Sequence, residues 1–192
     1  MKAKLKNRSG MTLMEIMVSI LILTILVVGM GTGMSTALEV YKKANFESKS
    51  ATLADTVNTS MSDVLHYAQN VDATGESPIF TNVDSNLLKV CFAIKDPDAN
   101  GAGVLCLRNA SNKDVLLFSR GTYGSLGIRN LKVVFCQEQE DEVVTINRIG
   151  ENGGTLSTAH GSFFYITYEI VETTDPTMVR QVESIVRPIT YL

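Results

Sequence analysis

The sequence has little of what enzymes and nucleic-acid-binding proteins need. Its two histidines, His66 and His160, are far apart and have no carboxylate or thiol motif beside them. It contains no G-x-S-x-G, no H-E-x-x-H and no glycine-rich phosphate loop ahead of a helix, so we do not expect an enzyme. The formal net charge is −3, and a mildly acidic exterior argues against a nucleic-acid-binding surface, which would show clustered lysine and arginine.

Cysteine is also scarce, and the spacings of Cys91, Cys106 and Cys136 resemble no zinc site. Three cysteines form at most one disulfide and leave one thiol over. Cys91 and Cys106 lie equidistant from the middle of the D-P-D-A-N-G segment at 96–101, so a symmetric hairpin would place them opposite each other as a possible disulfide. Cys136 has the same parity as Cys91 and is the alternative partner, and buried free thiols are the alternative to any bridge.

Proline is absent from residues 11–70, so no residue there forces a helix to break. Residues 11–30 alone provide 20 residues, about the ~20 that a helix needs to span a hydrocarbon core. After Glu15, only Ser19 and Thr24 interrupt this apolar run. The run therefore predicts a helix that crosses a membrane.

A stripe of mostly small side chains continues the helical pattern beyond the apolar run, with charged residues largely off it. Its members recur every three or four residues: Ala37, Tyr41, Ala44, Ser48, Ala51, Ala54, Val57, Met61, Val64 and Ala68. The stripe predicts an amphipathic continuation of the helix over 35–70. Small side chains suit close packing against a sheet, whereas a coiled coil would need a sustained seam of leucine and isoleucine.

Three glycines, Gly29, Gly31 and Gly33, lie between these two parts of the helix. They have two interpretations. Small residues four apart let helices approach closely in lipid. Alternatively, each glycine costs about 1 kcal/mol of helix propensity, so that the helix can bend or melt here.

Beyond a linker over 71–78, the periodicity of the apolar residues changes from 3.6 to 2. Apolar residues alternate with polar or small ones in segments that predict strands: 88–95, 104–108, 114–119, 128–137, 143–149, 162–172 and 178–189. Short turns rich in glycine, asparagine and aspartate separate them. One long helix followed by hairpin-linked strands predicts an α+β fold, in which the helix packs against an antiparallel β-sheet.

The segment at 96–101 also resembles the opening of an EF-hand calcium loop, with Asp96, Asp98 and Asn100 in the ligand positions. Such a loop needs a bidentate glutamate at its twelfth position, which here is Leu107. The same residues suit a tight hairpin loop without a metal. Calcium is therefore one of two interpretations, and the plain turn is the one we favour.

The N-terminus has an unusual distribution of charge. Residues 1–10 carry four basic side chains and no acid, and Glu15 is the only carboxylate at the start of the apolar run. A carboxylate in a membrane is costly, so it is by default a functional candidate. One interpretation is an ordinary secretory signal cleaved near 35–37, which has no use for Glu15, and another is a plain uncleaved anchor. If the chain is instead cut after Gly10, Glu15 can neutralise the new α-amino group.

Gly10, Thr12, Leu13 and Glu15, ahead of a long apolar helix, resemble the class III signal of type IV pilins and pseudopilins. The likeness covers about the first forty residues. Two features depart from the family pattern. Met11 stands where phenylalanine is commonest, and no proline follows about twenty residues after the cut.

The resemblance implies a role for each of these residues. Gly10 would be the cleavage residue, and Met11 the new N-terminus that prepilin peptidase methylates. Glu15, with Thr12 and Leu13, would serve assembly by pairing with the N-terminus of a neighbouring subunit. The implied partners are prepilin peptidase, other pilin or pseudopilin subunits, an assembly platform and the membrane, with no nucleic acid and no cofactor apart from the possible calcium.

The implied protein is a structural subunit, a minor pilin or pseudopilin, of a type IV pilus or a type II secretion filament. It would be a single-pass cytoplasmic membrane protein with its head outside, and later part of a cell-surface or periplasmic filament. The expected organisation is a cleaved leader over 1–10, a transmembrane and assembly helix over 11–34, its continuation over 35–70 and a β-rich head over 71–192. The alternative is a secreted or anchored extracellular binding module with an ordinary signal sequence.

Overall fold

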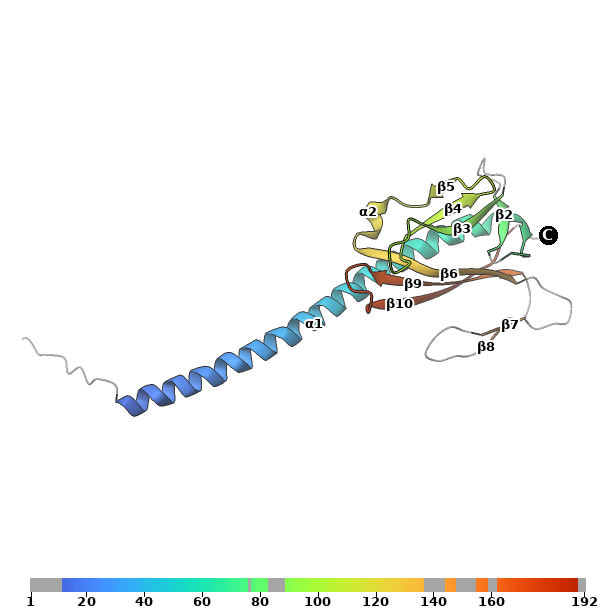
Figure 1. The fold of residues 1–192 in the computed structure, drawn as a ribbon. Coiled ribbons are helices and arrows are strands. Elements are labelled where there is room, and N and C mark those ends of the chain that lie inside the picture. Colours follow the sequence, from blue (N-terminus) through green and yellow to red (C-terminus); the bar gives the residue numbers. More distant parts are fainter. Residues whose placement is uncertain are drawn as a thin grey trace, which may run out of the picture. The chain divides into compact units, whose positions relative to one another are not determined.

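The computed structural model of the chain describes residues 12–75, 77–82, 89–136, 144–147, 155–158 and 162–189. The chain divides into two compact units, the first ending at Asn45 and the second beginning at Phe46. Helix α1, Leu13–His66, begins in the first unit and ends in the second. The remaining described elements belong to the second unit (Figure 1).

Two antiparallel sheets form the body of the second unit. The five-stranded sheet has the order β1-β2-β3-β4-β5 and the three-stranded sheet the order β10-β9-β6. The strands of the first are β1 Ala68–Asp72, β2 Ile79–Asn82, β3 Val90–Lys95, β4 Val104–Asn109 and β5 Asp114–Leu116. Those of the second are β6 Leu126–Cys136, β9 Phe163–Glu172 and β10 Val179–Val186, while β7 Val144–Asn147 and β8 Thr155–Thr158 form a separate hairpin. A short helix, α2 Arg120–Tyr123, leads into β6.

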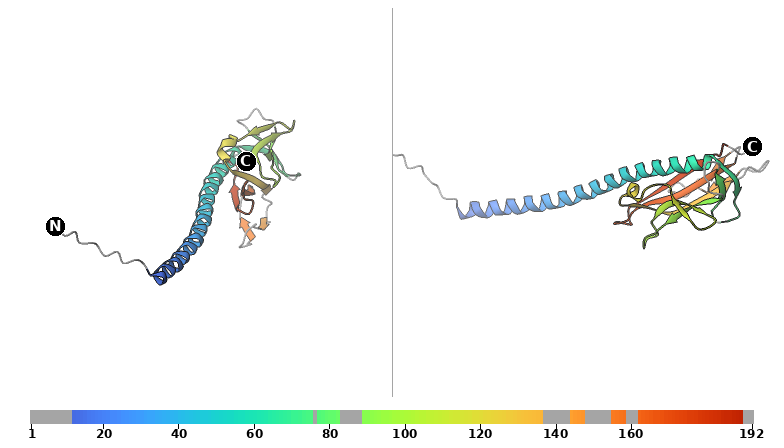
Figure 2. Two further views of the ribbon diagram at one scale, coloured as in Figure 1. Left: turned by 60° about the vertical axis from the view of Figure 1, so that its left-hand side comes forward. Right: turned by 90° about the horizontal axis from the view of Figure 1, so that it is seen from above.

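The core of the second unit lies between the end of α1 and the inner faces of the sheets. Figure 2 shows the end of α1 running beside the strands. Val57, Met61 and Leu65 of α1 are completely buried, and Ile166 and Tyr168 of β9 belong to the same cluster. The Tyr168 hydroxyl, on the inner face of β9, lies 3.0 Å from Asn58 Oδ1 and 3.3 Å from the carbonyl oxygen of Ala54. A helix packed on an antiparallel sheet confirms the expected α+β layout.

The buried stripe of α1 differs in part from the expected one. It agrees at Ala54, Val57 and Met61, but elsewhere the buried positions are shifted by one or two residues, which brings larger side chains such as phenylalanine and leucine into the core. The buried residues of α1 are Phe46, Ser50, Leu53, Ala54, Val57, Met61 and Leu65. Burying phenylalanine and leucine removes more apolar surface from water than burying alanine, which explains why the helix presents this face.

The helix ends at His66 rather than near residue 70, and β1 occupies part of the expected linker. Tertiary pairing accounts for the early end. Ala68 is completely buried opposite Asn82, and the Ile189 amide donates a 2.9 Å hydrogen bond to the His66 carbonyl. Asn70 has a left-handed φ of 49° at the irregular part of the β1–β2 pairing, which no helix could include.

The other expected strands lie within a few residues of the observed ones. Strands β1, β2 and β8 and helix α2 were not expected, and β5 is shorter than the predicted 114–119. These four unexpected elements are only four or five residues long, too short to show a period in the sequence.

Candidate assembly site at the start of the helix

Thr12 and Glu15 hold the first turn of α1 through reciprocal hydrogen bonds. The Thr12 amide donates to Glu15 Oε2 at 3.2 Å, and the Glu15 amide donates to Thr12 Oγ1 at 3.3 Å. The Thr12 hydroxyl also lies 3.3 Å from Glu15 Oε2. This arrangement is a capping box, which satisfies amide groups that have no partner within the helix.

The local pattern T-x-x-E at residues 12–15 is the sequence signature of this capping box. It gives Glu15 a local role in addition to the expected one in assembly. Because one carboxylate oxygen, Oε2, receives both Thr12 donors, the box also fixes the direction of the carboxylate. Leu13, the third expected assembly residue, is exposed. Gly10 and Met11 lie outside the described residues.

The large apolar side chains of the first unit are exposed in the isolated chain. They are Leu13, Met14, Ile16, Met17, Val18, Ile20, Leu21, Ile22, Leu23, Ile25, Leu26, Val27, Val28, Met30, Met34, Leu38, Val40 and Tyr41. By length and composition, α1 contains a segment that could cross a membrane, although a signal sequence would pass the same test. A helix that is apolar on every side needs lipid or other apolar surfaces around it.

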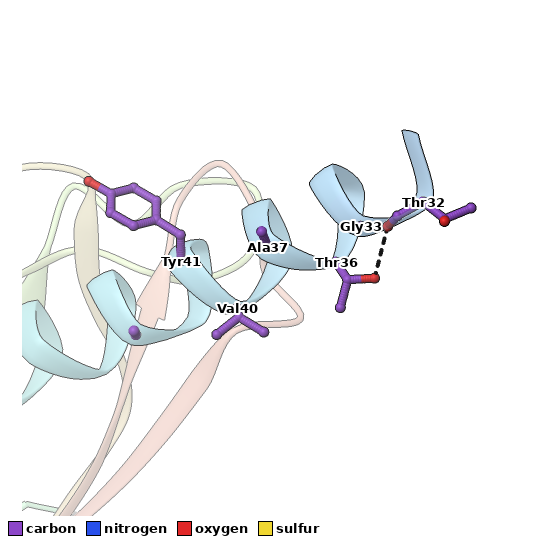
Figure 3. Close-up of a pocket in the computed structure, with 7 residues that line it drawn as sticks. Thr32, Gly33, Thr36, Ala37, Val40 and Tyr41 are labelled. Carbon is purple, nitrogen blue, oxygen red and sulfur yellow. Dashed lines mark hydrogen bonds between the residues drawn. The ribbon is translucent and has the colours of Figure 1, made fainter. Parts of the chain in front are cut away.

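The glycine segment is helical, and its side-chain hydroxyls bond back to the backbone. The Thr36 hydroxyl donates to the Thr32 carbonyl at 3.2 Å, and the Thr32 hydroxyl donates to the Gly29 carbonyl at 3.0 Å. A shallow apolar groove follows this side of the helix (Figure 3), lined by Thr32, Gly33, Thr36, Ala37, Val40, Tyr41 and Ala44. Apart from the adjacent residues and the backbone of the same helical turns, no described atom lies within 4 Å of a Cβ built on any of the three glycines. Both interpretations of the glycines, close helix approach and local melting, therefore stay open.

Hydrogen bonds to the Asp98 side chain hold the loop between β3 and β4. Asp98 Oδ1 accepts hydrogen bonds from the amides of Asn100 at 2.8 Å and Ala102 at 2.9 Å. Asp96 lies 3.9 Å from Arg120 in an exposed ion pair. Leu107, at the position where an EF-hand has its last ligand, is buried in the core. Within the part of the chain that the structure describes, no three histidine, cysteine, aspartate or glutamate side chains gather as a metal site would require. Calcium binding by Asp96, Asp98 and Asn100 stays a prediction, which a rise of the unfolding temperature in millimolar calcium would support.

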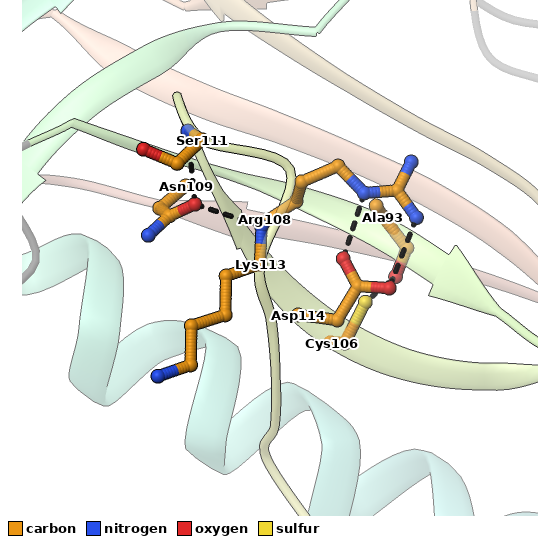
Figure 4. Close-up of polar contacts among 7 residues, drawn as sticks. All are labelled: Ala93, Cys106, Arg108, Asn109, Ser111, Lys113 and Asp114. Atoms are coloured by element: carbon orange, nitrogen blue, oxygen red, sulfur yellow. Dashed lines mark hydrogen bonds and ion pairs between the residues drawn. The ribbon is translucent and has the colours of Figure 1, made fainter.

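The expected pairing of Cys91 with Cys106 is wrong in register. Cys106 lies opposite Ala93, and Cys91 opposite Arg108, because the last pair before the loop is Lys95 with Val104. The two cysteines are therefore diagonal neighbours, with Cα atoms roughly 7–8 Å apart, beyond the usual range for a disulfide. The Cys106 thiol instead donates to the Ala93 carbonyl at 3.3 Å (Figure 4).

Cys136 is not the alternative partner either, because it packs against Phe163 and Tyr165 in a small cluster of its own. All three cysteines are free thiols. Burial, and then the nearby Asp114 carboxylate, raise the pKa of Cys106 to about 11, so this thiol is protonated and unreactive at neutral pH.

An ion pair covers the outer face of β4 and β5 beside Cys106. Arg108 Nε lies 2.7 Å from Asp114 Oδ1, and its Nη2 lies 3.2 Å from Oδ2, so the contact is bidentate (Figure 4). This hydrogen bond lowers the pKa of Asp114. The pair aligns β5 with β4 and carries no chemistry of its own.

Residues 5–31 match the model of the prokaryotic N-terminal methylation motif. No curated protein and no solved structure matches the chain. The matched segment includes the capping-box residues Thr12 and Glu15 and the beginning of the exposed apolar helix. The chain is therefore pilin-like, an α+β protein whose N-terminal segment carries the class III signal of type IV pilins.

Proposed function

We propose that the protein is a minor structural subunit of a type IV pilus or a type II secretion filament. Prepilin peptidase cuts it after Gly10 and methylates Met11, and an assembly platform then adds it to a filament of other pilin or pseudopilin subunits. The head lies outside the cytoplasmic membrane before assembly. The observation that carries the proposal is the methylation motif over 5–31, which points to a structural subunit processed by this peptidase.

The surface of the first unit supports assembly through the helix. Ile25 and Val28 are 65% and 67% exposed, although they belong to the most apolar part of the chain. In the membrane, lipid covers such side chains. Neighbouring helices would cover them in a filament, which buries the same apolar surface again outside the bilayer.

Glu15 would set the position of one subunit against the next. Residues four apart in an ideal helix are separated by about 6 Å along the axis at ~1.5 Å per residue, so a helix that included Met11 would hold its amine too far from Glu15 for a good ion pair. The capping box directs the Glu15 carboxylate toward Thr12, the residue next to Met11. An amine from a neighbouring subunit would neutralise the carboxylate, and an unpaired charge in this apolar setting would be costly.

Processing is tested by expressing the full chain with a prepilin peptidase and measuring the mature N-terminus by mass spectrometry. We expect N-methylated Met11, and we expect Gly10→Val to abolish cleavage while the chain still enters the membrane. A mature protein that starts after Ala37 would indicate an ordinary secreted module instead. Retention of Met1 would indicate a plain anchor, and normal processing of Gly10→Val would also contradict the proposal.

The role of Glu15 is tested with variants that separate charge from capping. Glu15→Gln keeps an acceptor oxygen for the Thr12 amide, since glutamine also serves in capping boxes, but removes the charge. We expect Glu15→Gln, Glu15→Ala and Glu15→Leu all to be cut and inserted, yet to enter purified filaments poorly. Glu39→Gln, which removes an exposed acid from the same helix, is the control. Normal incorporation of Glu15→Gln would show that capping, and not charge, is what assembly uses.

A further inference from the structure

The sheets of the second unit differ in how their edges are protected. Strand β5 is three residues long, and the pairing of β1 with β2 is irregular. Strand β6 has a register shift between Arg129 and Lys132, and an isolated bridge joins Ile128 on its other side to Gly103. Short strands, bulges and covering contacts are the features by which proteins prevent pairing at sheet edges.

Strand β10 has none of these three features, and its charged residues are Arg180 and Glu183. It is eight residues long, and its pairing with β9 runs without a shift from Val179, opposite Val171, to Val186, opposite Phe164. It contains no proline, and in the sheet order it is the last strand, so no described strand pairs with its outer side. A long, regular edge strand presents a row of backbone donors and acceptors to another strand.

The side chains of β10 on the outer face of the sheet are apolar at the ends and polar in the middle. Val179 is 37% exposed and Ile185 is 42% exposed, with Gln181 and Glu183 between them. They alternate with Arg180, Val182, Ser184 and Val186 on the other face, of which Val182 and Val186 are buried. The sequence of the outer row, apolar-polar-polar-apolar, reads the same from both ends.

This symmetry makes β10 complementary to itself in an antiparallel arrangement. Two antiparallel registers of β10 with β10 keep the outer-face side chains of both copies on the same side and overlap nearly the whole strand. One is centred on Val182 and the other on Glu183. The register centred on Glu183 would place two like charges opposite each other, which is unfavourable. The register centred on Val182 places Val179 opposite Ile185, and Gln181 opposite Glu183, on the outer face.

We propose that β10 pairs with β10 of a second copy of this chain, antiparallel and centred on Val182. The two three-stranded sheets then form one continuous sheet across a twofold axis. Each copy contributes the same residues, so apolar ends meet apolar ends and the glutamine amide can donate to the partner's carboxylate. The two backbone edges satisfy each other, as within any antiparallel sheet.

The contact is weak in dilute solution and stronger where the chains are held together. A single pair of strands buries less surface than a stable dimer interface, which needs roughly 1,000 Å² or more. Chains confined to one membrane or filament surface meet at a high effective concentration, which compensates for a small interface. Because a twofold contact closes on itself, it links heads in pairs and does not by itself propagate a filament.

The test is cysteine cross-linking of the full chain in membranes. Gln181→Cys and Glu183→Cys are made in separate chains that carry tags of different size, mixed and oxidised. We expect a heterodimer several-fold more abundant in this mixture than in a mixture of Arg180→Cys with Glu183→Cys, whose new side chains lie on opposite faces of the strand. The parental chain, with its three native cysteines, gives the background. Equal yields from the two mixtures would overturn the proposed register.

A second set of variants tests the edge itself. Val179→Lys with Ile185→Lys, in both cysteine chains, should lower the cross-linked fraction several-fold by placing charges on the edge. Val134→Lys is the matched control, because Val134 is 36% exposed on the same face but belongs to β6. An equal loss with Val134→Lys would mean a general effect of charge and would contradict pairing through β10.

The contact is separable from the proposed function. It lies in the second unit and needs neither cleavage nor Glu15, so Gly10→Val should cross-link as well as the parental chain. Normal processing with no cross-link would reject the β10 contact alone. Cross-linking without processing would support β10 pairing while rejecting the pilin-like function.

Discussion

The two parts of α1 have the same backbone conformation and opposite relations to their surroundings. In the first unit, up to Asn45, the large apolar side chains are exposed, and Val28 is 67% accessible. In the second unit, Val57 and Met61 are completely buried. The more apolar half of the helix is therefore the more exposed one.

The comparison shows that hydrophobicity alone does not specify burial within a chain. The second half has apolar residues on one face, which one sheet can cover. The first half is apolar on every side, so one sheet could cover only part of it. Its partners must come from outside the subunit, as lipid or as other helices. The proposed assembly through the helix would satisfy this requirement.

Two methionines of α1 provide the sharpest test of this contrast. Met61→Ala, in the buried half, should lower the free energy of unfolding of the second unit by about 2–5 kcal/mol, because it removes buried methylene groups and leaves a cavity. Met34→Ala, at a residue that is 68% exposed, should leave it nearly unchanged. Thermal unfolding of the chain in detergent, followed by near-ultraviolet circular dichroism of the tyrosines, measures both. Equal destabilisation by the two variants would contradict the difference in burial between the two halves of α1.

Two glycines test the same difference between the two units, with a somewhat smaller expected change in the free energy of unfolding. A Cβ at Gly103 would lie 2.5 Å from the Lys95 carbonyl oxygen and 2.6 Å from Ile94 Cγ2. Gly103→Ala should therefore destabilise the second unit by about 1–3 kcal/mol, measured in chemical unfolding.

Gly31→Ala is its control, because the added Cβ has no described atom within 4 Å apart from the neighbouring helix backbone and adjacent residues, and alanine favours the helix by about 1 kcal/mol. A destabilising Gly31→Ala would mean that the first unit has contacts that the isolated chain does not show.

A pair of tyrosines provides a third and smaller test. Tyr168→Phe removes the hydroxyl that lies 3.0 Å from Asn58 Oδ1 and should cost about 1 kcal/mol. Tyr41→Phe, at an exposed position in the first unit, should cost nothing measurable. Both values come from the same denaturant titrations, and a neutral Tyr168→Phe would show that this hydrogen bond does not hold the helix to the sheet.

Alkaline pH should weaken the second unit gradually. Burial raises the pKa of Tyr123 to about 12 and, together with the Asp114 carboxylate, that of Cys106 to about 11. A folded-state pKa above the unfolded value means that stability is complete below the unfolded pKa and is lost as pH rises through the folded one. We expect the unfolding temperature to fall between about pH 9 and pH 12, with a smaller fall for Cys106→Ala than for the parental chain. Identical slopes would mean that this thiol does not titrate with unfolding.

The sequence predicted the elements that are long or strongly periodic. Absence of proline and apolar periodicity predicted α1, and alternation predicted β3, β4, β6, β9 and β10 to within a few residues. It also contained the capping box of Thr12 and Glu15, which four residues are enough to specify. These features depend on neighbours along the chain, so local patterns can reveal them.

Local patterns did not predict which residues lie opposite Cys91 and Cys106, and they did not predict helix α2. The spacing of Cys91 and Cys106 suggested a hairpin centred within 96–101, but Lys95 pairs with Val104 and shifts the register by one position on each strand. Helix α2 has a single turn, and its Tyr123 hydroxyl accepts a 3.0 Å hydrogen bond from the Leu105 amide. That bond joins residues far apart in sequence, so no local pattern predicts it.

Local sequence is enough to specify the methylation signal, the apolar helix and the alternating strands that follow it. Charge, hydropathy and periodicity are properties of consecutive residues. Only the tertiary structure decided which face of the helix is buried, where the helix ends and which strand forms a regular edge. These outcomes depend on contacts such as Tyr168 with Asn58 and Ala68 with Asn82, whose partners come from different elements of the chain. Burial is a property of such contacts, and a residue's own hydrophobicity sets only how much free energy the contact releases.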